Sequence, residues 1–269
     1  MTRVVPTAQF ASIVYGAGGV SLADPAELFH EASRLYPNVA PSRLEVLEEL
    51  RGDGELSRSA ARSSRTHDHR PGVVLPAPRA LRGRLGEVMA RRRSERPDVL
   101  RPVRLRDLAT LLAASYAAAP RGRGLRRPVP SAGALYPLEV YVVAPAVTGV
   151  EPGVYHYDPF HRRLALLGSL RFADLRESLV DPTLADGAAA LLVVTGVFWR
   201  SRFKYGARGY RFTLLEAGHL VQNAVLASTD LELHALPLGG FHDVLLDRLV
   251  GADGLDESSL YALVLSASA

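Results

Sequence analysis

Hydrophobic and polar positions along the chain follow two periods, which together predict a mixture of helices and strands. Apolar residues recur every three or four positions over 105–118 and 210–228, which predicts two helices, the second of them long and central. A continuous apolar run over 188–198 predicts a buried strand. From position 138 the side chains alternate between two faces of a predicted strand, one with Leu138, Val140 and Val142 and the other with Glu139, Tyr141 and Val143.

Shorter signals complete the set of predicted elements. Helices are predicted at 24–37, after Pro41, from Leu85 and at 242–250; strands are predicted at 154–157, 164–167, 231–238 and 260–265. Because these elements mix without a regular βαβ repeat, we expect an α+β fold whose central sheet is mostly antiparallel and flanked by helices. The segment 52–72 is rich in Arg, Ser and Gly, so we expect a mobile linker there. We therefore divide the chain into an N-terminal helical extension, 1–80, and a core domain, 81–269.

Composition narrows the class of protein. With 48% hydrophobic and 22% charged residues the chain has the balance of a globular protein, and it contains no apolar run long enough for a bilayer. Zero cysteine excludes disulfides, thiolate zinc sites and cysteine nucleophiles, and with no signal-peptide pattern at the start we expect a cytoplasmic protein. The net charge is +4, but the arginine clusters at 91–93 and 121–127 lack interleaved aromatics, so we expect no nucleic-acid partner. We also expect no metal site, because His67 and His69 fall in the predicted linker.

Basic residues are distributed unevenly between the two types. Lys204 is the only lysine, whereas arginine supplies every other basic position. Lysine can lose its proton when it is desolvated, but arginine effectively never does. A position that keeps lysine in such a chain is a candidate for proton transfer, although one surviving surface lysine is the simpler explanation.

One stretch, 130–137, has a composition suited to a ligand that lies against backbone. It reads Pro-Ser-Ala-Gly-Ala-Leu-Tyr-Pro and combines small residues with two stiffening prolines. By residue type alone, an ordinary turn before a strand explains it equally well. The stretch resembles the flavin-contacting loop of nitroreductase-fold enzymes, above all the SagB-type dehydrogenases that oxidise azoline rings in ribosomally made peptides. Further stretches resemble the same branch in the same order: 28–33, 92–96, 203–206, 216–219 and 238–241.

The resemblance implies a bound FMN and an intertwined homodimer. It places the FMN phosphate on Arg92, Arg93, Ser94 and Arg96, and the flavin ring against Ser131, Gly133 and Ala134 of the partner's loop and against Leu238, Gly239 and Gly240. A solvated helix end would explain the arginines, and a plain turn would explain the glycines. Many nitroreductase-fold proteins carry further basic residues after the last strand. This sequence has Ser-Ala-Ser-Ala there, so we expect weaker FMN binding.

The same resemblance makes Lys204 and Tyr205 the catalytic pair. Oxidation of an azoline removes a proton from one ring carbon and a hydride from the next; a flavin accepts the hydride, and a desolvated lysine or a tyrosine can accept the proton. A positively charged loop is the alternative at this position. Glu216 and His219 lie three residues apart in the long helix, so we expect them to pair, chiefly in a structural role.

The expected function is therefore FMN-dependent oxidation of thiazoline or oxazoline rings in a peptide precursor to thiazole or oxazole. The expected partners are the peptide, a second copy of the chain and a cyclodehydratase. Two alternatives remain open. The first is another nitroreductase-fold oxidoreductase that uses NAD(P)H on a small molecule, and the second is a flavin-poor scaffold subunit of a peptide-modifying complex.

Overall fold

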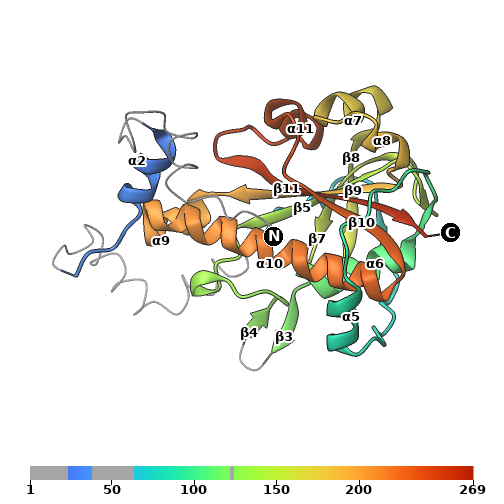
Figure 1. The fold of residues 1–269 in the computed structure, drawn as a ribbon, viewed down its shortest axis with the longest axis horizontal. Helices are drawn as coiled ribbons and strands as arrows, with labels where there is room; N and C mark the ends of the chain where they lie inside the picture. Colours follow the sequence, from blue (N-terminus) through green and yellow to red (C-terminus); the bar gives the residue numbers. More distant parts are fainter. Residues whose placement is uncertain (1–23, 38–63, 122–123, 269) are drawn as a thin grey trace, which may run out of the picture.

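The computed structural model describes residues 24–37, 64–121 and 124–268, and a seven-stranded antiparallel sheet forms its centre (Figure 1). The strands lie in the order β1-β8-β7-β5-β9-β11-β10. Their bounds are β1 Gly72–Val74, β5 Leu138–Ala144, β7 Gly153–Asp158, β8 Arg163–Ser169, β9 Ala190–Val197, β10 Leu233–Leu238 and β11 Glu257–Ala267. Two short pairs lie outside this sheet: β2 Val103–Arg104 with β6 Val147–Thr148, and β3 Ala119–Arg121 with β4 Gly124–Arg126.

Helices cover both faces of the sheet (Figure 1). One face packs against α6 Leu105–Tyr116 and α10 Ala207–Asp230, and the other against α7 Phe172–Ser178, α8 Leu184–Gly187 and α11 Asp243–Val250. The remaining helices are α2 Pro25–Ala32, α5 Leu85–Arg91, the 3-10 turn η2 Ala132–Ala134 and α9 Trp199–Tyr205. The predicted fold class, α+β with a central antiparallel sheet between helices, is confirmed.

Strand β5 shows why the core has two halves. The predicted alternation is confirmed: Leu138, Val140 and Val142 join the cluster under α6 and α10, while Tyr141 and Val143 join the cluster under α7 and α11. Both faces are buried, so the sheet is a central layer with apolar packing on each side. Glu139 is buried as well, which requires partners for its carboxylate.

The segment before the core is in contact with it where the structure describes it. Asp24 caps α2 by accepting a hydrogen bond from the amide of Ala26 at 2.8 Å, as predicted, but the helix ends at Ala32 rather than near position 37. Arg211 on α10 holds this end by donating to the hydroxyl of Ser33 at 2.7 Å. The helix expected after Pro41 and most of the predicted linker lie outside the described residues. The described end of that linker, 64–72, contacts the sheet and leads into β1.

Sequence periodicity missed several short helices around the sheet. Helices α7 and α8 were not predicted, and the stretch after β9 forms the helix α9 rather than a loop. These helices have four to seven residues, too few for a helical period to show in the sequence. Among the described helices, none is both long and apolar enough to span a bilayer.

Candidate functional site

The small-residue loop before β5 adopts a backbone that is unusual for its residue types. Gly133, Ala134 and Tyr136 have positive φ angles of 63°, 55° and 46°. Such angles cost free energy in residues with a Cβ, so the surrounding structure must hold the loop. The hydroxyl of Ser131 accepts a hydrogen bond from the amide of Tyr136 at 2.9 Å, and the Tyr136 hydroxyl accepts one from the amide of Arg127 at 3.2 Å. The loop is therefore a fixed, strained turn.

Helix α9 brings Lys204 and Tyr205 against this loop. A Cβ atom built on Gly133 would lie 2.7 Å from the Tyr205 hydroxyl and 3.0 Å from Lys204 Nζ. Lys204 Nζ in turn lies 5.5 Å from the centre of the Tyr205 ring. Two motifs about 70 residues apart in the sequence thus meet at a glycine, where a Cβ would require both side chains to move. Sequence analysis named Gly133 and the lysine–tyrosine pair separately, and the structure brings them into contact within one chain.

The start of α10 fixes α9 from behind. A Cβ on Gly209 would lie 2.7 Å from the backbone of Ser201, so only glycine allows the two helices to approach this closely. Helix α9 ends at Gly206, whose φ of 55° and ψ of −137° turn the chain into α10. Of the two arginines nearest to Lys204 in the sequence, Arg202 is exposed, and Arg208 donates to the Ser33 carbonyl.

Beneath the loop lies a buried polar group on α10. The Tyr116 hydroxyl donates to Glu216 Oε1 at 2.9 Å, and burial raises the pKa of Glu216 to about 7, against hydrogen bonds from Ser131 and Tyr116 that lower it. The predicted pairing of Glu216 with His219 is wrong, because His219 is exposed while Glu216 faces Tyr116 in the interior. Positions three apart in a helix share a face only approximately, so Glu216 lies in the core while His219 lies at the surface.

Arg127, the last arginine of the 121–127 cluster, completes the layer under the loop. Its guanidinium lies 4.2 Å from the centre of the Tyr116 ring and 4.9 Å from that of Tyr136. It is 6% exposed, and its three side-chain nitrogens have no hydrogen-bond partner among the described residues. Two electron-rich ring faces stabilise this buried cation. Tyr116 was predicted only as a core residue, and no spacing in the sequence links it to Arg127.

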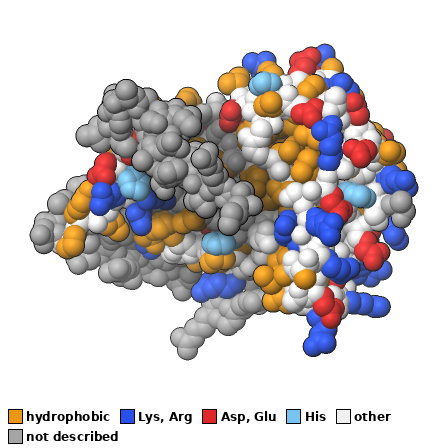
Figure 2. Space-filling view, viewed as in Figure 1, with side chains coloured by type: hydrophobic (Ala, Val, Ile, Leu, Met, Phe, Trp, Pro, Cys, Tyr) orange, Lys and Arg blue, Asp and Glu red, His pale blue; other side chains and the backbone are white. Residues whose placement is uncertain are grey.

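The predicted phosphate residues follow α5 on the outside of the molecule. Arg93 and Ser94 are exposed and Arg92 is half-buried, so their donors are available to a ligand. Arg96 is already engaged, because its guanidinium lies 2.7 Å from Asp181 Oδ2 and donates to Thr183 Oγ1 at 2.6 Å. Figure 2 shows many basic side chains on the side of the molecule where α5 lies.

The predicted phosphate segment lies far from the loop within one chain. The amide of Glu95 donates to the carbonyl of Ala235, which sets the phosphate segment beside β10. Ala235 pairs with Leu265 on β11, and Leu265 pairs with Ala190 at the start of β9, so the three residues lie at the same level of the sheet. Leu138, which follows the loop, pairs instead with Gly196, six residues further along β9. That offset is roughly 20 Å along the strands.

Leu238, Gly239 and Gly240 belong to the group beside the phosphate segment. Leu238 ends β10 only three residues after Ala235, about 10 Å along the strand. Both glycines are exposed, and a Cβ on Gly239 would meet no atom within 4 Å, which leaves its backbone accessible. Through β11, Leu238 is level with Val193, only three residues from the level of Leu138, so β10 leads from the phosphate segment toward the level of the loop, three strands away across the sheet.

Comparisons with known proteins place this arrangement among relatives. Residues 89–265 match the sequence pattern of the nitroreductase family. The MJ1384 protein of Methanocaldococcus jannaschii, named as a nitroreductase, is 37% identical over 161 residues, which cover 60% of this chain and 80% of that protein. The trifolitoxin-processing protein TfxB of Rhizobium leguminosarum and the microcin B17-processing protein McbC of Escherichia coli are each 32% identical, over 59% and 55% of this chain. The matches span 46% of TfxB and 57% of McbC, about half the length of these two relatives.

Solved structures agree on the fold. A nitroreductase structure from Anabaena variabilis superimposes with a TM-score of 0.65 and 26% identity, over 75% of this chain and 42% of that one. A chain of the Escherichia coli microcin synthetase McbBCD complex, with truncated pro-MccB17 bound, superimposes with a TM-score of 0.57 and 24% identity, over 93% of this chain and 98% of that one.

Proposed function

Because the chain belongs to the nitroreductase family, we propose that it is an FMN-dependent dehydrogenase that oxidises azoline rings of a peptide to azoles. The observation that carries this proposal is the contact of Lys204 and Tyr205 with Gly133. A general nitroreductase needs a flavin and a reductant, whereas azoline oxidation also needs a group that accepts a proton from carbon. The lone lysine and a tyrosine lie beside the loop that we expect to face the flavin.

The described residues fit FMN when two copies of the chain are combined. The phosphate would bind Arg92, Arg93 and Ser94, and the flavin ring would reach the open backbone at Gly239 about 10 Å along β10. The Gly133 loop of the same chain precedes Leu138, which lies about 10 Å from Leu238 along the strands and three strands away across the sheet. From the resemblance to the nitroreductase fold we propose that a second chain supplies the loop, Lys204 and Tyr205, in a homodimer with two shared sites.

Each residue of the loop side has a distinct task in this reaction. FMN, when bound, supplies the acceptor for the hydride that leaves the azoline ring. Lys204 takes the proton from the adjacent ring carbon, and the Tyr205 hydroxyl, which lies against the same glycine, orients Lys204 or shares the proton. Loss of both hydrogens converts a thiazoline to a thiazole or an oxazoline to an oxazole. The strained loop keeps the two groups at a fixed distance from the ring.

A peptide substrate and a cyclodehydratase partner are supported by the relatives. TfxB and McbC are named for processing trifolitoxin and microcin B17, and the McbBCD complex was solved with truncated pro-MccB17 bound. A cyclodehydratase is the class of enzyme that makes azolines from Cys, Ser or Thr. We propose that this chain acts on the product of such an enzyme.

The test is the turnover of a thiazoline-containing peptide by the wild type and by Lys204→Arg and Tyr205→Phe, after flavin content is measured. Lys204→Arg keeps the positive charge but cannot act as a base, so we expect normal FMN binding and at least about a hundredfold loss of turnover. Near-normal turnover by Lys204→Arg would refute the role of Lys204. A wild type that reduces nitro compounds with NAD(P)H but leaves the thiazoline intact would instead favour a general nitroreductase.

A further inference from the structure

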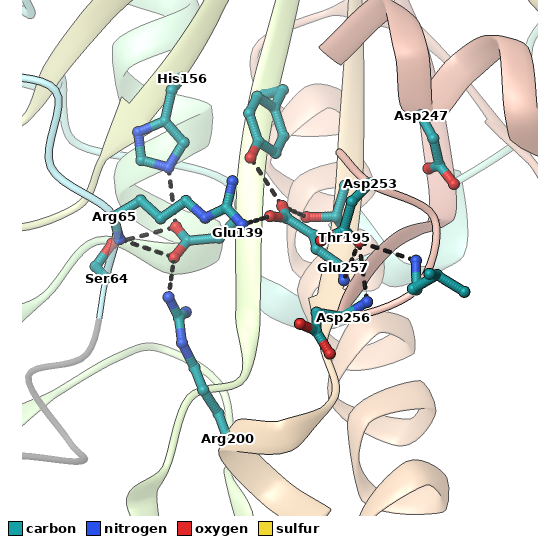
Figure 3. A network of polar contacts seen from close by, with 12 residues as sticks. Ser64, Arg65, Glu139, His156, Thr195, Arg200, Asp247, Asp253, Asp256 and Glu257 are labelled. Atoms are coloured by element: carbon teal, nitrogen blue, oxygen red, sulfur yellow. Dashed lines mark hydrogen bonds and ion pairs between the residues drawn. The ribbon is translucent and has the colours of Figure 1, made fainter. Parts of the chain in front are cut away.

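Two buried carboxylates lie behind α9, outside the site described above (Figure 3). Glu139 on β5 is 1% exposed and Glu257 on β11 is 0% exposed. A buried carboxylate is costly unless it is paired and hydrogen-bonded. The groups that satisfy these two come from the N-terminal segment at 64–65, from strands β5, β7 and β9, and from α9 itself.

Glu139 receives four donors. Arg200 Nη2 lies 2.7 Å and the amide of Arg65 lies 2.9 Å from Oε1, while His156 Nε2 lies 2.9 Å and the Ser64 hydroxyl 3.2 Å from Oε2. Burial favours the protonated form, yet the His156 hydrogen bond and the Arg200 charge lower the pKa of Glu139 to about 2. Glu139 is therefore a permanent anion to which Arg200 is attached.

Glu257 ties Arg65 of the N-terminal segment to the sheet. Its Oε1 accepts from the Tyr141 hydroxyl at 2.8 Å and from Thr195 Oγ1 at 2.5 Å. Arg65 Nη2 lies 2.6 Å from its Oε2, so Arg65 contacts one carboxylate with its backbone and the other with its side chain. In Figure 3, His156 approaches Glu139 from above and Arg200 from below, and Ser64 and Arg65 approach it from the side between them.

Arg200 transmits this arrangement to Lys204. The two residues are four positions apart on α9, so they share a helix face one turn apart. Arg200 is 5% exposed, and its Nε and Nη1 have no partner among the described residues. A buried ion pair with unsatisfied donors is a poor source of stability, because apolar residues of similar volume usually do as well. The Arg200–Glu139 pair therefore fits a role in holding α9 in position better than a role in stability.

We propose that Arg200 is a positioning residue for Lys204, and that Ser64 and Arg65 lock it in place from the N-terminal segment. Glu139 fixes Arg200, and Arg200 fixes the rotation and depth of α9. Lys204, one turn later, is thereby held against Gly133. This positioning role depends on the proposed function only in the test that measures turnover.

The first test does not depend on any activity. Lys204 is the only lysine, so protein labelled with ¹³C at lysine Cε gives a single lysine side-chain NMR signal. We expect Arg65→Met to move that signal by more than its linewidth, because the Glu139 cluster loses its outer clamp. Arg79→Met is the matched control: Arg79 also pairs with a buried carboxylate, that of Asp107 at 3.3 Å, and its side chain is 40% exposed against 38% for Arg65. An unmoved signal in Arg65→Met, or an equal shift in Arg79→Met, would overturn the proposal.

The second test separates positioning from simple support of the fold. We expect Arg65→Met to lower kcat for azoline oxidation about tenfold with KM within twofold, Arg65→Lys to recover most of kcat, and Arg79→Met to leave both unchanged. Arg200→Met should lower kcat further. If Arg200→Met does not fold, the Arg65 pair still decides the matter. A wild type without azoline turnover would refute the proposed function alone, since the NMR comparison would still test the positioning.

Discussion

Replacement of Gly133 by alanine perturbs the one point where the loop meets Lys204 and Tyr205. The new methyl group would lie 2.7 Å from the Tyr205 hydroxyl and 3.0 Å from Lys204 Nζ, both closer than ordinary contact. These atoms are the far ends of flexible side chains, so they can move away without disturbing the backbone. The substitution therefore displaces the proposed catalytic groups while it leaves the fold largely intact.

The stability cost comes mainly from the backbone. Gly133 has φ 63° and ψ 14°, and a residue with a Cβ pays about 1–2 kcal/mol in that region. For a chain of this size, a loss of that order lowers Tm by roughly 2–8 °C. The catalytic cost is larger, because a displacement of about 1 Å from the working geometry can reduce turnover about a hundredfold. The two magnitudes differ enough to be measured separately.

Gly251→Ala is the matched control for this experiment. Gly251 has a similar backbone, φ 79° and ψ 25°, but a Cβ there would meet no atom within 4 Å. Tm and turnover of a thiazoline peptide are measured for both variants at equal flavin loading. We expect similar falls in Tm, with turnover lost only in Gly133→Ala. Equal turnover in the two variants would show that contact with Gly133 does not control Lys204 and Tyr205.

Two further predictions concern the cofactor and pH. The double variant Arg92→Ala, Ser94→Ala should lose most of its FMN without unfolding. When this chain is mixed with Lys204→Arg chains, each mixed dimer should contain one complete site and recover turnover; no recovery in the mixture would refute the shared site. Glu216, with a pKa raised by burial to about 7 from 4.5, stabilises the folded state below pH 4.5 and loses that contribution as pH rises through 7. Relative to Glu216→Gln, the wild type should lose up to about 3 kcal/mol of unfolding free energy across that window, measured by urea denaturation; parallel curves would refute it.

The sequence predicts the central layers well because their signals are periodic. Strand β5 alternates between two apolar sets, and β7, β8 and β9 carry long apolar or alternating runs. Helices α6 and α10 have 12 and 24 residues, enough for a helical period to show. Helix α9 has seven residues with four polar or charged side chains, so its helical form depends on packing against α10 at Gly209 rather than on its own pattern.

The site is only partly visible in sequence because its contacts are non-local. Resemblance to a family identified Gly133 and Lys204 separately, but their contact depends on the path of the chain around the sheet. Glu216 was assigned the nearer candidate, His219, whereas its partner, Tyr116, is 100 residues away. Glu139 looked like an ordinary residue of an alternating strand. Nothing local predicts that its partners are residues on the N-terminal side of the core and on α9.

The contacts of three arginines and of Lys204 show why each position carries its type of basic residue. Arg127 stacks between rings, and Arg65 and Arg200 reach buried carboxylates, and each of these tasks suits a planar guanidinium with several fixed donors. At Gly133 the requirement is the opposite. Lys204 Nζ, a compact group, lies 3.0 Å from the Cβ position of Gly133, next to the Tyr205 hydroxyl. The proposed proton acceptor must also be able to lose its own proton, which an arginine effectively never does. Arg65 and Arg200 behind α9 are thus complementary to the amine of Lys204 in front of it. Because the two guanidinium groups keep their protons, they can hold α9 in the same position while Lys204 carries out its proposed proton transfer.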